Sequence, residues 1–132
     1  LSEHISVRSI VGNFLEHSRI FCFSNDKNPE IYMGSADWMP RNLDRRVEIL
    51  FPVEDGDLKE SVMHILKVEL EDNVKAHILQ PDGTYEKVDK RGKTLVNSQE
   101  QFCEEAIRAA ASHRPEDDPA VTRVFKPIES GG

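Results

Sequence analysis

The chain has 132 residues, which is enough for one domain with its own hydrophobic core. Hydrophobic residues make up 38% and charged residues 31%, which is typical of a folded domain and not of a disordered or membrane-spanning chain. The net charge of −7 argues against general binding of nucleic acid, so a phosphate site would have to be a local basic pocket. We recognise no signal peptide in the sequence. Cys22 and Cys103 lack the spacing of metal ligands, so we expect them to be free, buried thiols in a reducing cytoplasm.

The first third of the chain predicts short strands. Residues 5–7 alternate between apolar and polar types and predict a strand, and residues 9–15 predict a helical turn. Residues 17–23 are rich in Ile, Phe and Cys and predict a second strand. A turn cluster at residues 24–29 follows, so residues 31–33 predict the return strand of a hairpin.

The next segment contains strong breakers of regular structure. Residues 34–43 predict an irregular loop, because Gly34 and Pro40 interrupt any periodicity. Residues 45–51 place apolar side chains at alternate positions and predict a strand, which Pro52 ends.

The clearest helix of the sequence lies at residues 58–71, where apolar residues recur at i, i+4, i+7 and i+8. Asp57 is the predicted N-cap, with Glu60 three residues on as in a capping box. Residues 74–79 and 85–88 then predict two strands joined by a hairpin turn.

A second helix is predicted to begin at Ser98 and to carry an apolar stripe as far as Ala110. From residue 113 the composition turns to Pro, Asp, Arg and Glu, so we expect a polar tail at residues 113–132 after a single domain at residues 1–112. This order of elements predicts an α/β or α+β fold, with a mixed sheet and packed helices.

His17 and Arg19 suggest a site for an anion. Residues i and i+2 lie on the same face of a strand, so these two side chains can point at one ligand. A histidine and arginines suit phosphate, and Arg41, Arg45 and Arg46 follow nearby. On a strand Arg45 and Arg46 would point to opposite faces, so only one of them would reach the ligand. The alternative is that His17 is structural and that the arginines form a solvated face.

Two segments resemble a known family. They are Phe14-Leu15-Glu16-His17-Ser18-Arg19 and the run from Ser35 to Glu48 that contains Ser-Ala-Asp-Trp-Met. Together they are similar to the C-terminal domain of bacterial polyphosphate kinase of the long, multidomain type, over about residues 1–110. The family resembles the phospholipase D fold, in which each of two related halves shows His-x-Lys, an Asp five residues later and Gly-Ser-x-Asn.

This chain keeps only part of the phospholipase D pattern. His17 and Gly34-Ser35 are present, whereas Arg19, Ser24 and Asp37 replace the Lys, Asp and Asn. The loss of Lys and Asp argues against a phosphodiesterase. Gly34 and Ser35 would offer backbone N–H groups to an anion. We expect Trp38 to lie in the core, and the alternative is that it lines a pocket.

The resemblance implies an enzyme that reversibly transfers the terminal phosphate of ATP to polyphosphate. It implies that a histidine in a preceding half is phosphorylated, while His17 faces the phosphates of the nucleotide. The predicted catalytic residue is His17, and the predicted ATP- and phosphate-binding residues are His17, Arg19, Ser35, Arg41, Arg45 and Arg46. No residue of this chain is assigned to a metal, because we expect Mg²⁺ to bridge the phosphates with ligands outside the chain.

The predicted partners are ATP or ADP, polyphosphate, the preceding domains of a longer enzyme, and further copies in a homo-oligomer. Nucleic acid is not an expected partner, and the expected location is cytoplasmic or membrane-associated. The isolated chain should fold but make negligible polyphosphate, because the phosphorylated histidine lies in the absent half. The alternative function is a non-catalytic phosphate-binding or assembly module.

Overall fold

The computed structural model describes residues 3–112. The chain divides into two units, of which the first ends at Gln99 and the second begins at Glu100. Within residues 3–112, the strands and the helices α1 and α2 lie in the first unit, and the second unit contains α3 (Ser98–Ser112) from Glu100 onward. The predicted tail at residues 113–132 lies outside the described residues, so its boundary stays a prediction.

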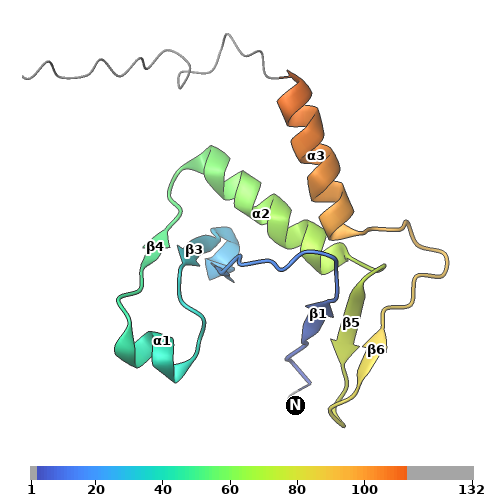
Figure 1. Ribbon diagram of the computed structural model, residues 1–132, viewed down its shortest axis with the longest axis horizontal. Coiled ribbons are helices and arrows are strands. Elements are labelled where there is room, and N and C mark those ends of the chain that lie inside the picture. The colour runs from blue at the N-terminus through green and yellow to red at the C-terminus, as the bar shows by residue number, and fades with distance from the viewer. Residues whose placement is uncertain (1–2, 113–132) are drawn as a thin grey trace, which may run out of the picture. The chain divides into compact units, whose positions relative to one another are not determined.

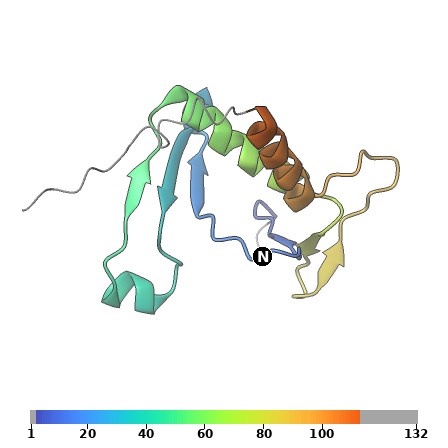
Figure 2. The same ribbon diagram turned by 45° about the horizontal axis from the view of Figure 1, so that its top comes forward.

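Three strands, β2 (Ile20–Phe23), β3 (Glu30–Gly34) and β4 (Leu50–Pro52), form an antiparallel sheet in the order β2-β3-β4. The turn cluster forms the short 3₁₀ helix η1 (Asn25–Lys27), whose three residues all have positive φ. The predicted hairpin is therefore confirmed, with Ile20 paired to Met33. Figure 2 shows the three strands side by side.

The connection between β3 and β4 differs from the prediction. It contains the helix α1 (Pro40–Arg45), with Pro40 in the first turn. Proline suits this position because its fixed φ is helical and its missing N–H has no helical partner there. The predicted strand at residues 45–51 is wrong in its first half, since Arg45 is helical and the strand begins only at Leu50. Pro52 belongs to β4, which is an edge strand and can accommodate proline.

Helix α2 (Gly56–Glu71) covers one face of this sheet. Its N-cap is Asp55, whose carboxylate accepts a hydrogen bond from the Leu58 N–H at 3.0 Å, so the prediction of Asp57 as the cap is wrong. The buried core of the sheet and helix consists of Ile31, Val53 and Val62, with Ile20 and Met33 packed against it. Cys22 is exposed beside Met63, and Cys103 is also an exposed free thiol, so the prediction of buried thiols is wrong.

A second antiparallel sheet has the order β1-β5-β6, with β1 (Arg8–Ile10), β5 (Ala76–Leu79) and β6 (Tyr85–Lys87). The predicted hairpin of β5 and β6 is confirmed. The predictions of a strand at residues 5–7 and a helical turn at 9–15 are wrong, because the chain extends at 8–10 to pair with β5.

Helix α2 runs from the first sheet to the second (Figure 1). The mixed α/β class is confirmed, with two small antiparallel sheets instead of one mixed sheet. Within residues 3–112, no helix combines the length and apolar character needed to cross a membrane.

The fully buried Asp72 holds the end of α2, the approach to β5 and the start of α3 together. Its Oδ1 atom accepts hydrogen bonds from the N–H groups of Val74, Lys75 and Ala76 at 2.8–3.1 Å. Its Oδ2 atom accepts from the N–H and the hydroxyl of Ser98 at 2.8 and 2.9 Å. Burial by itself raises the pKa of Asp72, but the hydrogen bonds from Ser98, Lys75 and Val74 outweigh burial and lower it.

Candidate functional site

The segments around His17 and Ser35 meet at one end of the β2-β3-β4 sheet. The Gly34 N–H donates to the Arg19 carbonyl at 3.1 Å, and the Ser35 N–H donates to the Ile49 carbonyl at 3.0 Å. Strand β2 begins and β3 ends at this end of the sheet, where α1 also lies (Figure 2). The two sequence segments that carry the family resemblance are therefore neighbours in space.

Arg19 is the residue that joins these segments. Its guanidinium binds the Asp37 carboxylate through Nε at 2.9 Å and through Nη2 at 2.7 Å. Its Nη1 donates to the backbone carbonyl of His17 at 2.6 Å. Only 22% of the Arg19 side chain is exposed, so the guanidinium is held within the fold. Arg19 thus fixes the backbone of His17 and shares its charge with Asp37.

The His17 side chain is exposed and makes no hydrogen bond or ion pair within residues 3–112. Strand β2 begins only at Ile20, so His17 and Arg19 do not lie side by side on a strand as predicted. Their link is the hydrogen bond from the Arg19 side chain to the His17 backbone, which leaves the imidazole free to meet a ligand.

Arg41 and Arg45 are exposed and lie one turn apart on α1, so they share a helix face. Arg46 donates to the side-chain carbonyl of Asn42 at 3.3 Å. The prediction that strand geometry separates Arg45 from Arg46 is wrong, because Arg45 is helical. In the described part of the chain, no hydrogen bond or ion pair links Arg41, Arg45 or Arg46 to His17.

Asn42 is a site residue that the sequence analysis assigned only to a loop. It is 3% exposed, and its side-chain amide donates to the Asp37 carbonyl at 3.3 Å. Asn42 therefore connects α1 to the residue that binds Arg19. The signal for this role was Pro40, which is compatible with the first turn of a helix and would have placed Asn42 within it.

The backbone of Gly34 and Ser35 is not available to an anion. Both N–H groups donate to carbonyl groups, so the predicted role for them is wrong. The Ser35 hydroxyl donates to the Glu48 carboxylate and accepts from the Ile49 N–H at 3.1 Å. A phosphate contact from Ser35 would require Glu48 to release the hydroxyl, and this contact stays a prediction.

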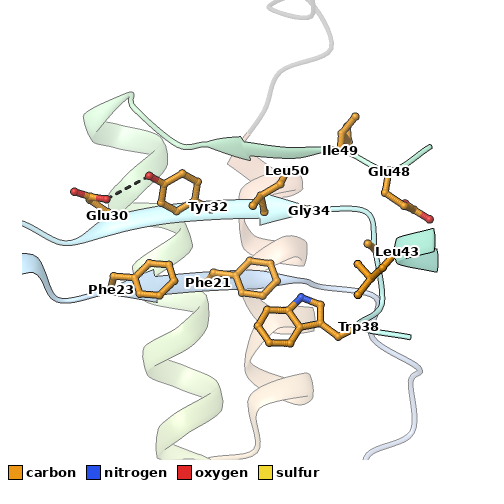
Figure 3. A pocket seen from close by; sticks show the side chains of 11 residues that line it. Phe21, Phe23, Glu30, Tyr32, Gly34, Trp38, Leu43, Glu48, Ile49 and Leu50 are labelled. Atoms are coloured by element: carbon orange, nitrogen blue, oxygen red, sulfur yellow. Dashed lines mark hydrogen bonds between the residues drawn. The ribbon is translucent and has the colours of Figure 1, made fainter. Parts of the chain in front are cut away.

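The sheet face opposite α2 carries aromatic side chains. Phe21 stacks on Trp38 with ring centres 5.5 Å apart, and Phe23 and Tyr32 follow on the same face (Figure 3). They line an open, mainly apolar pocket of about 540 Å³. Trp38 is 77% exposed, so the prediction that it belongs to the core is wrong.

A smaller pocket of about 290 Å³ lies beside Arg19, Asp37 and Trp38. It places a cation, a carboxylate and an indole ring next to each other at the edge of the aromatic face. The site can therefore offer a charged contact and a stacking surface to one ligand.

The carboxylates at this site do not form a magnesium site. Asp37 is bound to Arg19, and Glu48 accepts from Ser35. Nowhere in residues 3–112 do three His, Cys, Asp or Glu side chains gather closely enough to hold a metal ion.

Comparison with known proteins gives consistent results. The sequence model of the family described as Polyphosphate kinase C-terminal domain 2 matches residues 1–99. The polyphosphate kinase of Lactiplantibacillus plantarum is 47% identical over 119 residues, which are 90% of this chain and 17% of that protein. The polyphosphate kinase of Synechocystis sp. is 48% identical over 124 residues, which are 94% of this chain and 16% of that protein.

The crystal structure of polyphosphate kinase from Porphyromonas gingivalis has the same fold, with a TM-score of 0.76 and 32% identity. The match covers 84% of this chain and 17% of that one, so this chain spans about one sixth of the length of these relatives. The resemblance seen in the sequence is confirmed by the family match and by the fold. The chain belongs to the polyphosphate kinase C-terminal domain 2 family.

Proposed function

We propose that this chain is part of the catalytic region of an ATP:polyphosphate phosphotransferase, which reversibly transfers the terminal phosphate of ATP to polyphosphate. The observation that carries the proposal is the identity of 47–48% with proteins named polyphosphate kinase over 90% or more of the chain. Since the chain spans 16–17% of those proteins, the activity is proposed for a longer enzyme that contains it.

In this proposal His17 faces the phosphates of the nucleotide. Phosphoryl transfer depends mainly on positioning and on neutralising the charge of the phosphoryl oxygens, so a fixed N–H donor is an effective catalytic group. The exposed imidazole has no competing partner in residues 3–112, and the Arg19 guanidinium holds its backbone. His17 would donate a hydrogen bond to a phosphate oxygen, and the group that accepts the phosphate covalently would lie outside this chain.

The arginines would have different roles. Arg19 would orient His17 and contact phosphate with the N–H groups that Asp37 and the His17 carbonyl leave free. Arg41 and Arg45 would present two charges from one face of α1 to ATP or polyphosphate. Arg46 and Ser35 would contact phosphate only after they release their present partners, which are Asn42 and Glu48.

The other expectations belong to the longer enzyme. Mg²⁺ would neutralise charge on the phosphates and would be held by those phosphates and by residues outside this chain. The preceding domains and further copies of the enzyme would be its protein partners, and we propose that it is cytoplasmic or membrane-associated.

The alternative is a non-catalytic phosphate-binding or assembly module. Its support is that Asp37 already neutralises Arg19, which limits the positive charge that this chain offers. The two functions differ in turnover. The catalytic proposal predicts that His17→Ala slows phosphate transfer in the full-length kinase with the fold retained, whereas the module predicts unchanged turnover. The 132-residue chain alone should make negligible polyphosphate from ATP, and steady chain growth from it would contradict the proposed division of roles.

A further inference from the structure

One buried side chain, that of Gln99, binds the segment that leads to His17 at several points. Gln99 is 8% exposed, and its Oε1 atom accepts hydrogen bonds from the N–H groups of Asn13 at 2.8 Å and Phe14 at 3.0 Å. Its Nε2 atom donates to the Phe14 carbonyl and to the Glu16 carboxyl, both at 2.8 Å. One amide thus binds the backbone on both sides of Phe14 and the side chain next to His17.

Gly12 makes room for this contact. A Cβ atom at residue 12 would lie 2.7 Å from Nε2 of Gln99 and still closer to its Cδ and Oε1 atoms. Real Cβ atoms essentially never come so close, so any other residue at this position would push the amide away. Because the amide is the end of a flexible side chain, it can move without distortion of the backbone.

A second anchor joins the same segment to α2. Glu16 shares a hydrogen bond with Glu69, and burial together with this neighbour raises the pKa of Glu69 to about 7. The protonated Glu69 can donate to Glu16, while Glu16 also accepts from Gln99. Below about pH 7, where Glu69 is mainly protonated, the residue before His17 is therefore held from two directions.

The start of α3, which carries Gln99, is itself fixed, because Asp72 accepts hydrogen bonds from the N–H and the hydroxyl of Ser98. A continuous set of contacts therefore runs from Asp72 through Ser98 and Gln99 to residues 13–16. From there it reaches the His17 carbonyl, which Arg19 binds on the other side.

We infer that Gln99 is a positioning residue for the phosphate-transfer reaction, which holds residues 13–16 so that the His17 imidazole reaches the phosphate, and that Gly12 is the residue that admits it. The inference rests on the proposed function of His17. It assigns to Gln99 no contact with the substrate. A loss of the amide would misplace His17 by loosening its backbone, and a misplacement of about 1 Å in a catalytic group can cost on the order of a hundredfold in rate.

The test is Gln99→Met in the full-length kinase that carries this domain, because methionine keeps the length of the side chain and removes its hydrogen bonds. We expect kcat to fall on the order of 10- to 100-fold, with KM for ATP changed less than about twofold, since His17 acts in the transition state. The matched control is Gln101→Met in the same helix, whose amide binds Glu105 instead of the His17 segment, and kcat should be unchanged.

Gly12→Ala supplies an independent variant that keeps glutamine at position 99 but displaces its amide. It should give the same loss of kcat, and the double variant Gly12→Ala with Gln99→Met should lose no more than either single variant, because both remove the same contact. Losses that multiply in the double variant would overturn the inference.

Amide hydrogen exchange gives a readout that does not depend on activity. In Gln99→Met the N–H groups of Asn13 and Phe14 should exchange faster, while those of β5 stay protected. Unchanged exchange at both residues would overturn the inference, as would normal kcat in Gln99→Met. Failure of the proposed function would look different, because His17→Ala would then also keep normal activity.

Discussion

Replacing Asp72 by Asn should lower the free energy of unfolding by about 1.5–3 kcal/mol. In the native chain the Oδ1 atom of Asp72 accepts from three backbone N–H groups of residues 74–76, and Oδ2 accepts from the N–H and hydroxyl of Ser98. Asparagine can keep the three bonds at Oδ1. Its NH₂ group, however, would stand opposite the Ser98 N–H, so two donors would face each other.

The magnitude follows from this exchange. The Ser98 hydroxyl can rotate and accept from the new NH₂ group, so its loss is small. The buried Ser98 N–H loses a charged acceptor and gains no replacement, which typically costs about 1.5–3 kcal/mol. Asp72→Ala would remove all five bonds and should cost more than Asp72→Asn.

The assay is urea unfolding of the 132-residue chain, with the midpoint compared at an unchanged m-value. The control is Asp82→Asn, since Asp82 is exposed and accepts from the N–H and hydroxyl of Thr84 in a turn, and its loss should stay below about 0.5 kcal/mol. Acid supplies a second check. The lowered pKa of Asp72 contributes stability that is lost as the pH falls through its folded pKa, and this loss should shrink in Asp72→Asn. If Asp72→Asn and Asp82→Asn lowered the free energy of unfolding equally, the reasoning would be refuted.

Three further predictions concern titration and the arginines. The raised pKa of Glu69, caused first by burial, predicts that the free energy of unfolding falls as the pH rises from about 4.5 to about 7, and Glu69→Gln should flatten this slope in urea titrations; an unchanged slope would contradict it. Arg19→Lys in the full-length kinase should lower kcat about tenfold, because a point charge cannot replace the fork that binds a carboxylate and a carbonyl together, and normal kcat would count against its role. Arg41→Ala combined with Arg45→Ala should raise KM for ATP or polyphosphate by on the order of tenfold without lowering Tm, and unchanged KM values for both would remove α1 from the site.

The sequence predicted those elements whose signals are local. The β2-β3 hairpin follows from a turn cluster between two apolar runs, and α2 follows from its own periodicity. By contrast, β1 depends on pairing with β5 far along the chain, so its residues alone could not place it. Pro40 is ambiguous in the sequence, because a proline can either interrupt a helix or begin one, and the structure shows that Pro40 begins α1.

The same distinction applies to the site. His17 and Arg19 could be predicted as candidate site residues because they belong to a contiguous segment that resembles the family. Gln99 could not, since its partners at residues 13–16 lie far away in the sequence and a lone glutamine has no periodic signal. The prediction for Trp38 was wrong because apolar character alone does not distinguish a core residue from one that lines an exposed pocket.

The most direct test of the central claim is the initial rate of polyphosphate synthesis from ATP by the full-length kinase with His17→Ala, measured beside its Tm. We predict a loss of about a hundredfold, corresponding to about 3 kcal/mol of transition-state stabilisation from one donor, with Tm unchanged. His64→Ala is the control, because His64 is an exposed histidine on α2 outside the site, and it should keep a nearly normal rate. A near-normal rate in His17→Ala, or a loss that follows only from unfolding, would contradict the assignment of His17 to the phosphates.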